Sequence, residues 1–355
     1  MFIKDLSCIS AQETYHNSVF TDGVKDIEDL KIWAQEPDYK DIIPAGMLRR
    51  MSKLVRMSVA TAGPFMEEHK NLGGVIFGSS NGSVDRSMRF LRQIIQYEEG
   101  TLTPTDFVQS TPNCVAGVLA LMGNITGYNT THVNQGLSFE SSILDALLLF
   151  EEGKVSQLLL GGGDELSEAN YNIESQRDLY KEESIATSTL LRSETKGTLP
   201  GEGVAMFVVE AEKTKESLAE IIDVDMIHHA SKQEVAEKAV QFLNKNGLKP
   251  SDIDAVIMGR NGDVRTDNFY DHLQNELFPE QGIIVYKSLT GDYYSVSAVA
   301  TWLATKVLSG TQLPSECIWK PLNNQPKTIL LYNNCEGKQH GFVLMRGVYS
   351  STSSE

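Results

Sequence analysis

Short apolar runs alternate with segments of helical periodicity along the whole chain. Residues 73–80 (GGVIFGSS) form an apolar run bounded by glycine, which predicts a buried strand, and residues 84–95 (VDRSMRFLRQII) have a helical period. Residues 131–135 and 138–153 repeat this order as a strand, a turn and a helix. Apolar strands that alternate with helices predict mainly parallel sheets covered by helices. The pattern therefore predicts an α/β fold.

The same order of elements starts again in the second half of the chain. Residues 219–230 predict a strand, and residues 234–247 predict an amphipathic helix that ends at a glycine. This recurrence predicts an internal duplication with its seam near residues 210–220. We expect four parts: an N-terminal half over residues 1–212, a polar surface excursion within it at residues 167–201, a C-terminal half over residues 213–350, and a frayed tail at residues 351–355.

Charge and composition limit the partners of the chain and its location. The 355 residues carry a formal net charge of −16, which makes nucleic acid and anionic membrane surfaces unfavourable partners. No apolar run reaches the roughly 18 residues that a membrane span needs, and the first ten residues predict a strand instead of a signal peptide. We therefore expect a cytoplasmic protein that binds neither nucleic acid nor a membrane.

The cysteines give no sign of a metal site. Cys8, Cys114, Cys317 and Cys335 are scattered, and they form neither a CxxC pair nor a metal-ligand spacing. Such usage is typical of reduced thiols in a cytoplasm. No metal ligand set is predicted. A lone cysteine such as Cys114 is expected to pack as a small apolar side chain.

The stretch VNQGLSFESSILDA, residues 133–146, joins a predicted strand to an apolar helix. A turn of this kind is a common position for a catalytic nucleophile, because the start of a helix stabilises an anion. The stretch contains no cysteine, and its hydroxyls at Ser138 and Ser141 have no obvious base nearby in the sequence. We expect these serines to cap the helix.

Several segments together resemble the β-ketoacyl-acyl-carrier-protein synthases of the thiolase-like superfamily. They follow the family's order over nearly the whole chain: PAGMLRRMSKLVRMSVATA (44–62), VQSTPNCVAGVLALMGNITG (108–127), SILDALLLFEEGKVSQLLLGGGDE (142–165), LPGEGVAMFVVE (199–210) and YKSLTGDYYSVSAVA (286–300). The resemblance implies a thiolase-like α/β fold. In that fold, duplicated βαβαβαββ halves form a five-layered αβαβα architecture.

The resemblance also implies a reaction. In the family, a cysteine at the start of a buried helix is acylated from the phosphopantetheine of a carrier protein, and no further cofactor is needed. Two histidines, in H-G-T-x-T and T-G-H motifs, promote decarboxylation and stabilise the oxyanion. A lysine supports the second histidine. A glycine-rich loop with phenylalanines gates the acyl chain.

This chain departs from the family at each of these catalytic positions. The nucleophile falls on Gly136, or on Gln135 if the alignment slips by one residue. Arg260 or Asn261 stands in place of the first histidine, and Asp292 stands in place of the second. The family lysine is retained as Lys287, which we expect to pair with Asp292. The gate segment NNCEGKQHG, residues 333–341, has neither phenylalanine.

Such losses are typical of the chain length factors, ketosynthase-like subunits that pair with an active ketosynthase. The resemblance implies a heterodimer in polyketide, fatty-acid-type or aryl-polyene-like biosynthesis, in which this subunit shapes the partner's acyl tunnel. The resemblance implies that the dimer interface lies at residues 108–122 and 131–134. Leu119, Met122 and Phe139 are candidate tunnel or interface side chains, and the alternative for each is core packing.

Two other interpretations remain open from the sequence, and a third is discounted. In the first, the chain is a divergent synthase or acyltransferase that uses Cys335, with His340 nearby in sequence as its base. In the second, the chain is a homodimer that binds acyl groups or carriers without a ketosynthase partner. A Gln135 variant that only decarboxylates is disfavoured, because that reaction needs the missing histidines. Asp267, Asp271 and Glu276 are expected on a solvated helix face, not at a metal site.

One basic cluster stands out in the acidic chain. It consists of Arg49, Arg50, Lys53, Arg56, Arg86, Arg89 and Arg92. Carrier proteins are acidic, so this cluster is a candidate docking surface. The overall charge of −16 opposes docking, and we expect the carrier to bind mainly to the partner subunit.

Overall fold

The two halves of the chain build the same arrangement of five strands. In the computed structural model, which describes residues 1–348, the first half orders its strands β4-β3-β5-β7-β1 and the second half β10-β9-β12-β13-β8. Numbered within each half, both orders are third, second, fourth, fifth, first. The predicted duplication is therefore confirmed by topology. The first-half strands are β1 (Phe2–Ile9), β3 (Gly74–Gly78), β4 (Tyr128–His132), β5 (Gln157–Asp164) and β7 (Gly203–Glu210).

The strands of the two halves join into one mixed sheet of eleven strands. β1 pairs antiparallel with β8 through Phe2 with Glu220 and Ile3 with Ala219. A short edge strand, β11 (Ile318–Lys320), ends the sheet on one side, and β4 ends it on the other. The second-half strands are β8 (Ala219–His228), β9 (Ala255–Met258), β10 (Gly282–Val285), β12 (Thr328–Cys335) and β13 (Gln339–Gly347).

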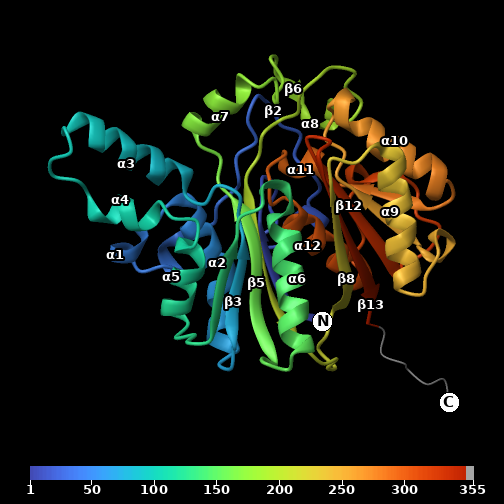
Figure 1. Cartoon of the computed structure of the whole chain (residues 1–355), viewed down its shortest axis with the longest axis horizontal. Coiled ribbons are helices and arrows are strands. Elements are labelled where there is room, and N and C mark those ends of the chain that lie inside the picture. The colour runs from blue at the N-terminus through green and yellow to red at the C-terminus, as the bar shows by residue number, and fades with distance from the viewer. Residues whose placement is uncertain (349–355) are drawn as a thin grey trace.

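Within residues 1–348, three large apolar clusters fill the spaces between helices and strands, and a fourth, small one lies around Leu190 and Leu199. One large cluster contains α6 and α12, which lie between the two halves of the sheet, and the other two join α2 and α5 to the first half and α9 and α10 to the second (Figure 1). This layering agrees with the predicted thiolase-like α/β fold. The helices are α1 (Ala45–Leu48), α2 (Lys53–Glu68), α3 (Val84–Gln96), α4 (Pro104–Gln109), α5 (Cys114–Met122), α6 (Ser138–Glu151), α7 (Glu168–Ser175), α8 (Thr187–Leu190), α9 (Lys232–Lys245), α10 (Val264–Leu277), α11 (Lys287–Thr290) and α12 (Ser297–Leu308).

Strand β3 is apolar throughout because both of its faces are covered. On β3, Ile76 enters the central cluster with α6, whereas Val75 and Phe77 enter the cluster with α2 and α5. Successive side chains of a strand point to opposite faces, so a strand buried on both faces has a continuous apolar run. Gly162 of β5 lets α6 approach closely, since a Cβ there would lie 2.7 Å from Cδ2 of Phe139.

The excursion predicted at residues 167–201 contains short elements of its own. It includes α7, α8 and the two-residue strand β6 (Ile185–Ala186), which pairs with β2 (Glu28–Asp29). These elements lie together at one end of the molecule, at the top of Figure 1. The excursion is thus a folded cover and not an irregular loop.

Two further predictions concern the ends and the membrane. The predicted frayed tail, residues 351–355, lies outside the described residues. Within residues 1–348, none of the helices combines the length and the apolar character that a bilayer crossing requires.

Candidate functional site

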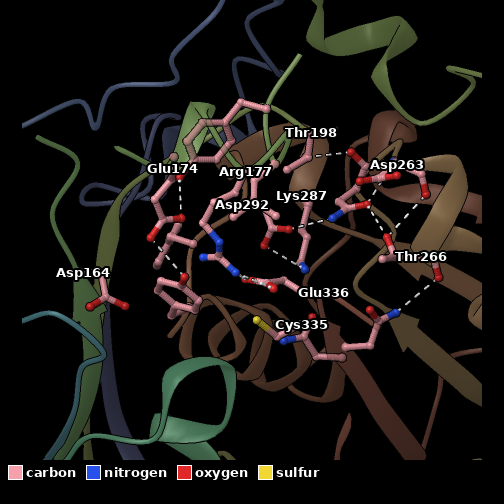
Figure 2. A pocket seen from close by; sticks show the side chains of 18 of the residues that line it. Asp164, Glu174, Arg177, Thr198, Asp263, Thr266, Lys287, Asp292, Cys335 and Glu336 are labelled. Atoms are coloured by element: carbon pink, nitrogen blue, oxygen red, sulfur yellow. Dashed lines mark hydrogen bonds and ion pairs between the residues drawn. The ribbon is translucent and has the colours of Figure 1, made fainter. Parts of the chain in front are cut away.

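A cavity of about 570 Å³ opens where strands of both halves end (Figure 2). Asp164 at the end of β5, Lys287 after β10 and Cys335 at the end of β12 all line it. The excursion at 167–201 covers the cavity with side chains that include Glu174 and Arg177. Ligand sites of α/β folds lie at the carboxyl ends of parallel strands. This cavity is therefore the candidate functional site.

Lys287, Asp292 and Asn261 form one connected polar group in the cavity wall. The Lys287 Nζ lies 2.8 Å from the Asp292 Oδ1, and the Asn261 Nδ2 donates to the Asp292 Oδ2 at 2.7 Å. The Lys287 side chain is only 1% exposed. The predicted Lys287–Asp292 ion pair is therefore confirmed. At the two positions where the resemblance expects histidines, the chain thus has an amide, Asn261, and a carboxylate, Asp292, that are already partnered.

Arg260 and Asn261 were alternatives for the position of the first histidine, and the structure separates them. Asn261 lines the cavity, but Arg260 lies outside the lining. The Arg260 guanidinium stacks over the Trp319 ring at 4.6 Å and donates to Asp271 at 2.6 Å. Of the two alternatives, the structure thus places Asn261 in the cavity wall, because the long Arg260 side chain finds an aromatic and a carboxylate partner elsewhere.

The position of Asp267 differs from the prediction of a solvated helix face. This carboxylate is buried, and it accepts hydrogen bonds from the backbone N–H groups of Asn261 and Gly262, each at 3.0 Å. It therefore shapes the loop that carries Asn261 and does not lie on a solvated helix face. Asp271 and Glu276, the other two carboxylates of that prediction, are exposed.

The start of α6 is closed by the β12–β13 hairpin. The Gly136 backbone N–H donates to the Gln339 Oε1 at 2.9 Å. A Cβ on Gly136 would lie 2.2 Å from the Cβ of Cys335, so the Cys335 side chain fills the space beside Gly136. Backbone N–H groups at such a helix start are the donors that can hold an oxyanion. Here one of them is already bonded to the chain's own amide.

Gln135 lies in the turn before α6 with an unusual backbone conformation. Its φ is 46°, in the left-handed region that residues with side chains rarely adopt. The residue is exposed, and it is not among those that line the cavity. Position 135 therefore has room for a side chain, whereas Gly136 does not. The expectation that Ser138 and Ser141 cap the helix is wrong, because the N-cap of α6 is Leu137 and no side chain caps it. The Ser138 Oγ instead accepts from the Asn134 backbone N–H at 2.9 Å in the preceding turn, and the Ser141 Oγ donates to the Leu137 carbonyl at 2.8 Å.

Cys335 does not have the base that a nucleophilic thiol needs. In the hairpin Cys335 pairs with Gln339, and His340 pairs with Asn334. Neighbouring strand residues point to opposite faces, so His340 faces away from Cys335, and its Nδ1 lies 3.0 Å from the Tyr332 hydroxyl. Burial raises the pKa of the Cys335 thiol and lowers the pKa of His340 to about 4. The predicted Cys335–His340 pairing is wrong.

Two buried carboxylates near the cavity were missed by the sequence analysis. Asp164 accepts from the hydroxyls of Ser79 and Ser295 at 2.8 and 2.7 Å. Glu165 accepts from the backbone N–H groups of Leu54 and Asp85 at 2.8 and 3.1 Å, and burial raises its pKa to about 7. The sequence does carry a signal for both residues, because two acids directly follow a buried apolar strand.

The candidate interface side chains fall into two groups. Leu119 and Phe139 are fully buried in apolar clusters, as the core-packing alternative expected, so neither reaches a surface of this chain. Met122 is 36% exposed at the end of α5. Other exposed apolar side chains occur on α3 to α6 and around the edge strand β4: Leu91, Ile95, Phe107, Val108, Leu121, Tyr128, Val133, Leu144 and Leu148.

One group of potential metal ligands occurs within residues 1–348, and it lies outside the cavity lining. Asp5, Glu68 and His69 bring their ligand atoms within 4.8 Å of one another. The His69 Nε2 lies 2.6 Å from the Asp5 Oδ2, which already explains the arrangement as an ion pair. We assign no metal to it.

Comparisons with known proteins agree with this fold. Residues 27–244 match the family model described as the beta-ketoacyl synthase N-terminal domain. No curated protein sequence matches the chain. A chain of the complex between the ketosynthase ApeO and its chain length factor ApeC from Xenorhabdus doucetiae superposes with a TM-score of 0.76 at 16% identity, over 98% of both chains.

Two further solved structures have the same fold. A beta-ketoacyl synthase from Burkholderia phymatum STM815 has a TM-score of 0.78 at 17% identity, over 98% of this chain and 99% of that chain. The ishigamide ketosynthase/chain length factor has a TM-score of 0.77 at 14% identity, over 98% and 99%. At these identities the likeness establishes the fold alone.

Proposed function

The chain belongs to the beta-ketoacyl synthase family, and from this premise we propose that it is a subunit without condensing activity, a chain length factor. It would form a heterodimer with an active ketosynthase in polyketide-type or fatty-acid-type biosynthesis. It would complete the dimer and bound the acyl tunnel of its partner. The acyl groups would arrive on the phosphopantetheine of a carrier protein, with no further cofactor.

The closed start of α6 is the observation that carries this proposal. A condensing enzyme needs a thiolate there, and free backbone N–H groups to hold the oxyanion. Gly136 has no space for a thiol beside Cys335, and its N–H is bonded to Gln339. At position 135, where a side chain fits, the residue is a glutamine. An amide cannot be acylated as a thiol is.

The partnered cavity wall supports the same conclusion. The family reaction needs two groups that donate and accept protons around neutral pH. The Asn261 side chain is an amide that does not titrate, and the Asp292 carboxylate is paired with Lys287 at 2.8 Å. Cys335, the alternative nucleophile, is kept as a thiol by burial, which raises its pKa. The divergent-enzyme interpretation is therefore the weaker one.

The surface around β4 supports a partner of the same fold. β4 is an edge strand, so one row of its backbone groups has no strand beside it within residues 1–348. Leu121 on α5, a helix that packs against β4, is 84% exposed, and Val108 on α4 is 63% exposed. Such an edge and apolar surface are usually covered in the functional assembly. We propose that a ketosynthase subunit adds its own sheet at β4.

The proposed control of chain length acts through this interface. Leu119 and Phe139 are core residues, so the side chain of Met122 is the one of the three candidates that can reach a partner. A flexible, apolar methionine at a contact surface fills space in a neighbouring apolar tunnel. We propose that Met122 and its neighbours on α5 form part of the closed end of the partner's tunnel.

The basic cluster supports docking of the carrier to the partner. Lys53 is paired with Glu202, Arg56 with Glu36, and both Arg86 and Arg89 with Asp106. Within the described residues, Arg49, Arg50 and Arg92 form no ion pair and are exposed. We expect the complex to keep carrier binding after Arg49→Glu, Arg50→Glu and Arg92→Glu. Loss of binding with an intact partner would contradict this part of the proposal.

Two measurements test the proposed function. The purified chain is incubated with an acyl-carrier thioester and its intact mass is recorded; no stable acyl adduct is expected, and an adduct abolished by Cys335→Ser would favour the divergent enzyme. The chain is also co-expressed with candidate ketosynthases. A one-to-one complex that makes the ketosynthase soluble supports the proposal. A homodimer that co-purifies with none of the ketosynthases supports an acyl-binding protein that acts alone.

A further inference from the structure

The roof of the cavity is held by polar contacts. Residues 167–180 include α7, in which Glu174 is the buried residue and the apolar Ile173 is 55% exposed. A helix that buries no apolar side chain gains little from the hydrophobic effect. Segments of this kind sit at the low end of local stability and open without unfolding of the whole protein.

Three contacts join this roof to the second half of the chain. The Glu174 Oε1 accepts from the Tyr294 hydroxyl at 3.1 Å, and the Asp178 carbonyl accepts from the Arg265 Nη2 at 2.7 Å. The Arg177 Nη2 donates to both carboxylate oxygens of Glu336, at 3.1 and 2.9 Å (Figure 2). The roof is thus pinned across the cavity by hydrogen bonds and one ion pair.

Glu336 is the point at which the roof meets the β12–β13 hairpin. Within residues 1–348, its pair with Arg177 is the ion pair that joins residues 167–201 to this hairpin. Lys338 also pairs with Glu336 at 2.8 Å, but it belongs to the hairpin itself and does not bridge the cavity. Both cations contact the same carboxylate, but Arg177 crosses from the roof and Lys338 does not.

We propose that residues 167–180 form a lid over the cavity, latched by the Arg177–Glu336 ion pair. Side chains of this pair are 47% and 19% exposed, so the pair is weak and screened by salt. The lid opens when the pair is broken, and the cavity then becomes accessible. This property belongs to the chain alone, so it goes beyond the proposed function and does not depend on it.

Cys335 provides a reporter for lid opening. It lines the cavity next to Glu336, and it is the one of the four cysteines that is not fully buried. N-Ethylmaleimide reacts with a thiol only when it can reach it. The rate of modification at Cys335, located by peptide mass mapping, therefore reports how often the lid is open, and Cys335→Ser confirms the assignment.

The experiment compares two charge removals at the same carboxylate. In low salt, Arg177→Gln should increase the rate of Cys335 modification roughly threefold, as expected for loss of a partly exposed ion pair. Lys338→Gln, the matched control, should leave the rate unchanged. Added NaCl should increase the rate of the unmodified chain and have little effect on Arg177→Gln.

Hydrogen exchange separates lid opening from a general loss of stability. Arg177→Gln should speed exchange of the amides in residues 170–180 and leave α6 unchanged. The proposal is overturned if the Arg177→Gln and Lys338→Gln rates are equal, if NaCl has no effect on the unmodified chain, or if α6 exchanges faster together with the lid.

Discussion

Glu140 is a buried acid on α6 whose carboxyl group is only partly satisfied by hydrogen bonds. Its side chain has no exposed surface; the Oε2 accepts from the Ser297 hydroxyl at 3.1 Å, and within residues 1–348 the Oε1 has no hydrogen-bond partner. Burial raises the pKa of Glu140 from 4.5 to about 7, although Lys287 and the hydrogen bonds act in the opposite direction. At a pH between these two values, the folded chain therefore holds a proton on Glu140 that the unfolded chain has released.

This proton makes stability depend on pH. Between about pH 4.5 and 7 the folded state binds more protons than the unfolded state, so the free energy of unfolding falls as the pH rises through this range. Glu140→Gln should remove this part of the slope, a difference on the order of 2–3 kcal/mol between pH 5 and 8. Urea unfolding at several pH values measures it, with the exposed Glu151→Gln as control. Parallel slopes for Glu140→Gln and the unmodified chain would refute the assignment.

Gly136 is the residue at which the closed site is most sensitive to substitution. A Cβ there would lie 2.2 Å from the Cβ of Cys335. Gly136→Ala should therefore lower the free energy of unfolding by about 1–3 kcal/mol, and Cys335→Gly in the same chain should restore part of the loss. Gly117→Ala on α5 is the control, because a Cβ there meets nothing within 4 Å. Equal effects of the two alanines, measured by urea unfolding, would contradict the steric argument.

At the scale of elements, the exposed apolar side chains of α5 beside β4 contribute little to the fold of the isolated chain. Leu121 is 84% exposed, so Leu121→Asp should change the free energy of unfolding by less than about 0.5 kcal/mol. It should nevertheless abolish co-purification with a ketosynthase partner, because it places a charge in an apolar contact. Ile173→Asp on the distant α7, at a residue 55% exposed, should leave the complex intact. A complex that survives Leu121→Asp would exclude this surface as the interface.

The elements were predictable where one local pattern decides the structure. The buried strands β3 and β5 are continuous apolar runs, and their alternation with amphipathic helices gave the duplicated α/β fold. The contact between Gly136 and Gln339 joins residues 203 positions apart, and nothing in either segment indicates it. The sequence could not decide between Arg260 and Asn261 for the same reason, because Trp319, the partner of Arg260, comes from a distant edge of the sheet. Local sequence therefore predicted the scaffold better than the site.

At the scale of the whole molecule, Asp164 ties the two halves together at the cavity. It accepts from Ser79 and from the backbone of Asn81 in the first half, and from both the backbone and the hydroxyl of Ser295 in the second. Both groups of donors are buried or nearly so. Removal of the carboxylate would leave them unpaired away from water.

Asp164→Ala should consequently lower the free energy of unfolding by at least about 3 kcal/mol. Hydrogen exchange should become faster both in the loop at residues 79–83 and at the start of α12, since one carboxylate orders both. Asp85→Ala, at an exposed acid in the first turn of α3, is the control. Faster exchange confined to one half would mean that Asp164 does not couple them.

The hydrogen bond from Gly136 to Gln339 also bears on the evolutionary history of the chain. A single mutation to cysteine at position 135 or 136 would meet a helix start whose N–H is occupied, a wall in which Asn261 and Asp292 are bonded to each other, and a hairpin whose Cys335 fills the adjacent space. If the chain is the chain length factor proposed above, a return to condensing activity would need changes on four separate segments. Under that proposal, a lineage that reaches this arrangement has no single-step route back and depends on another protein for the chemistry.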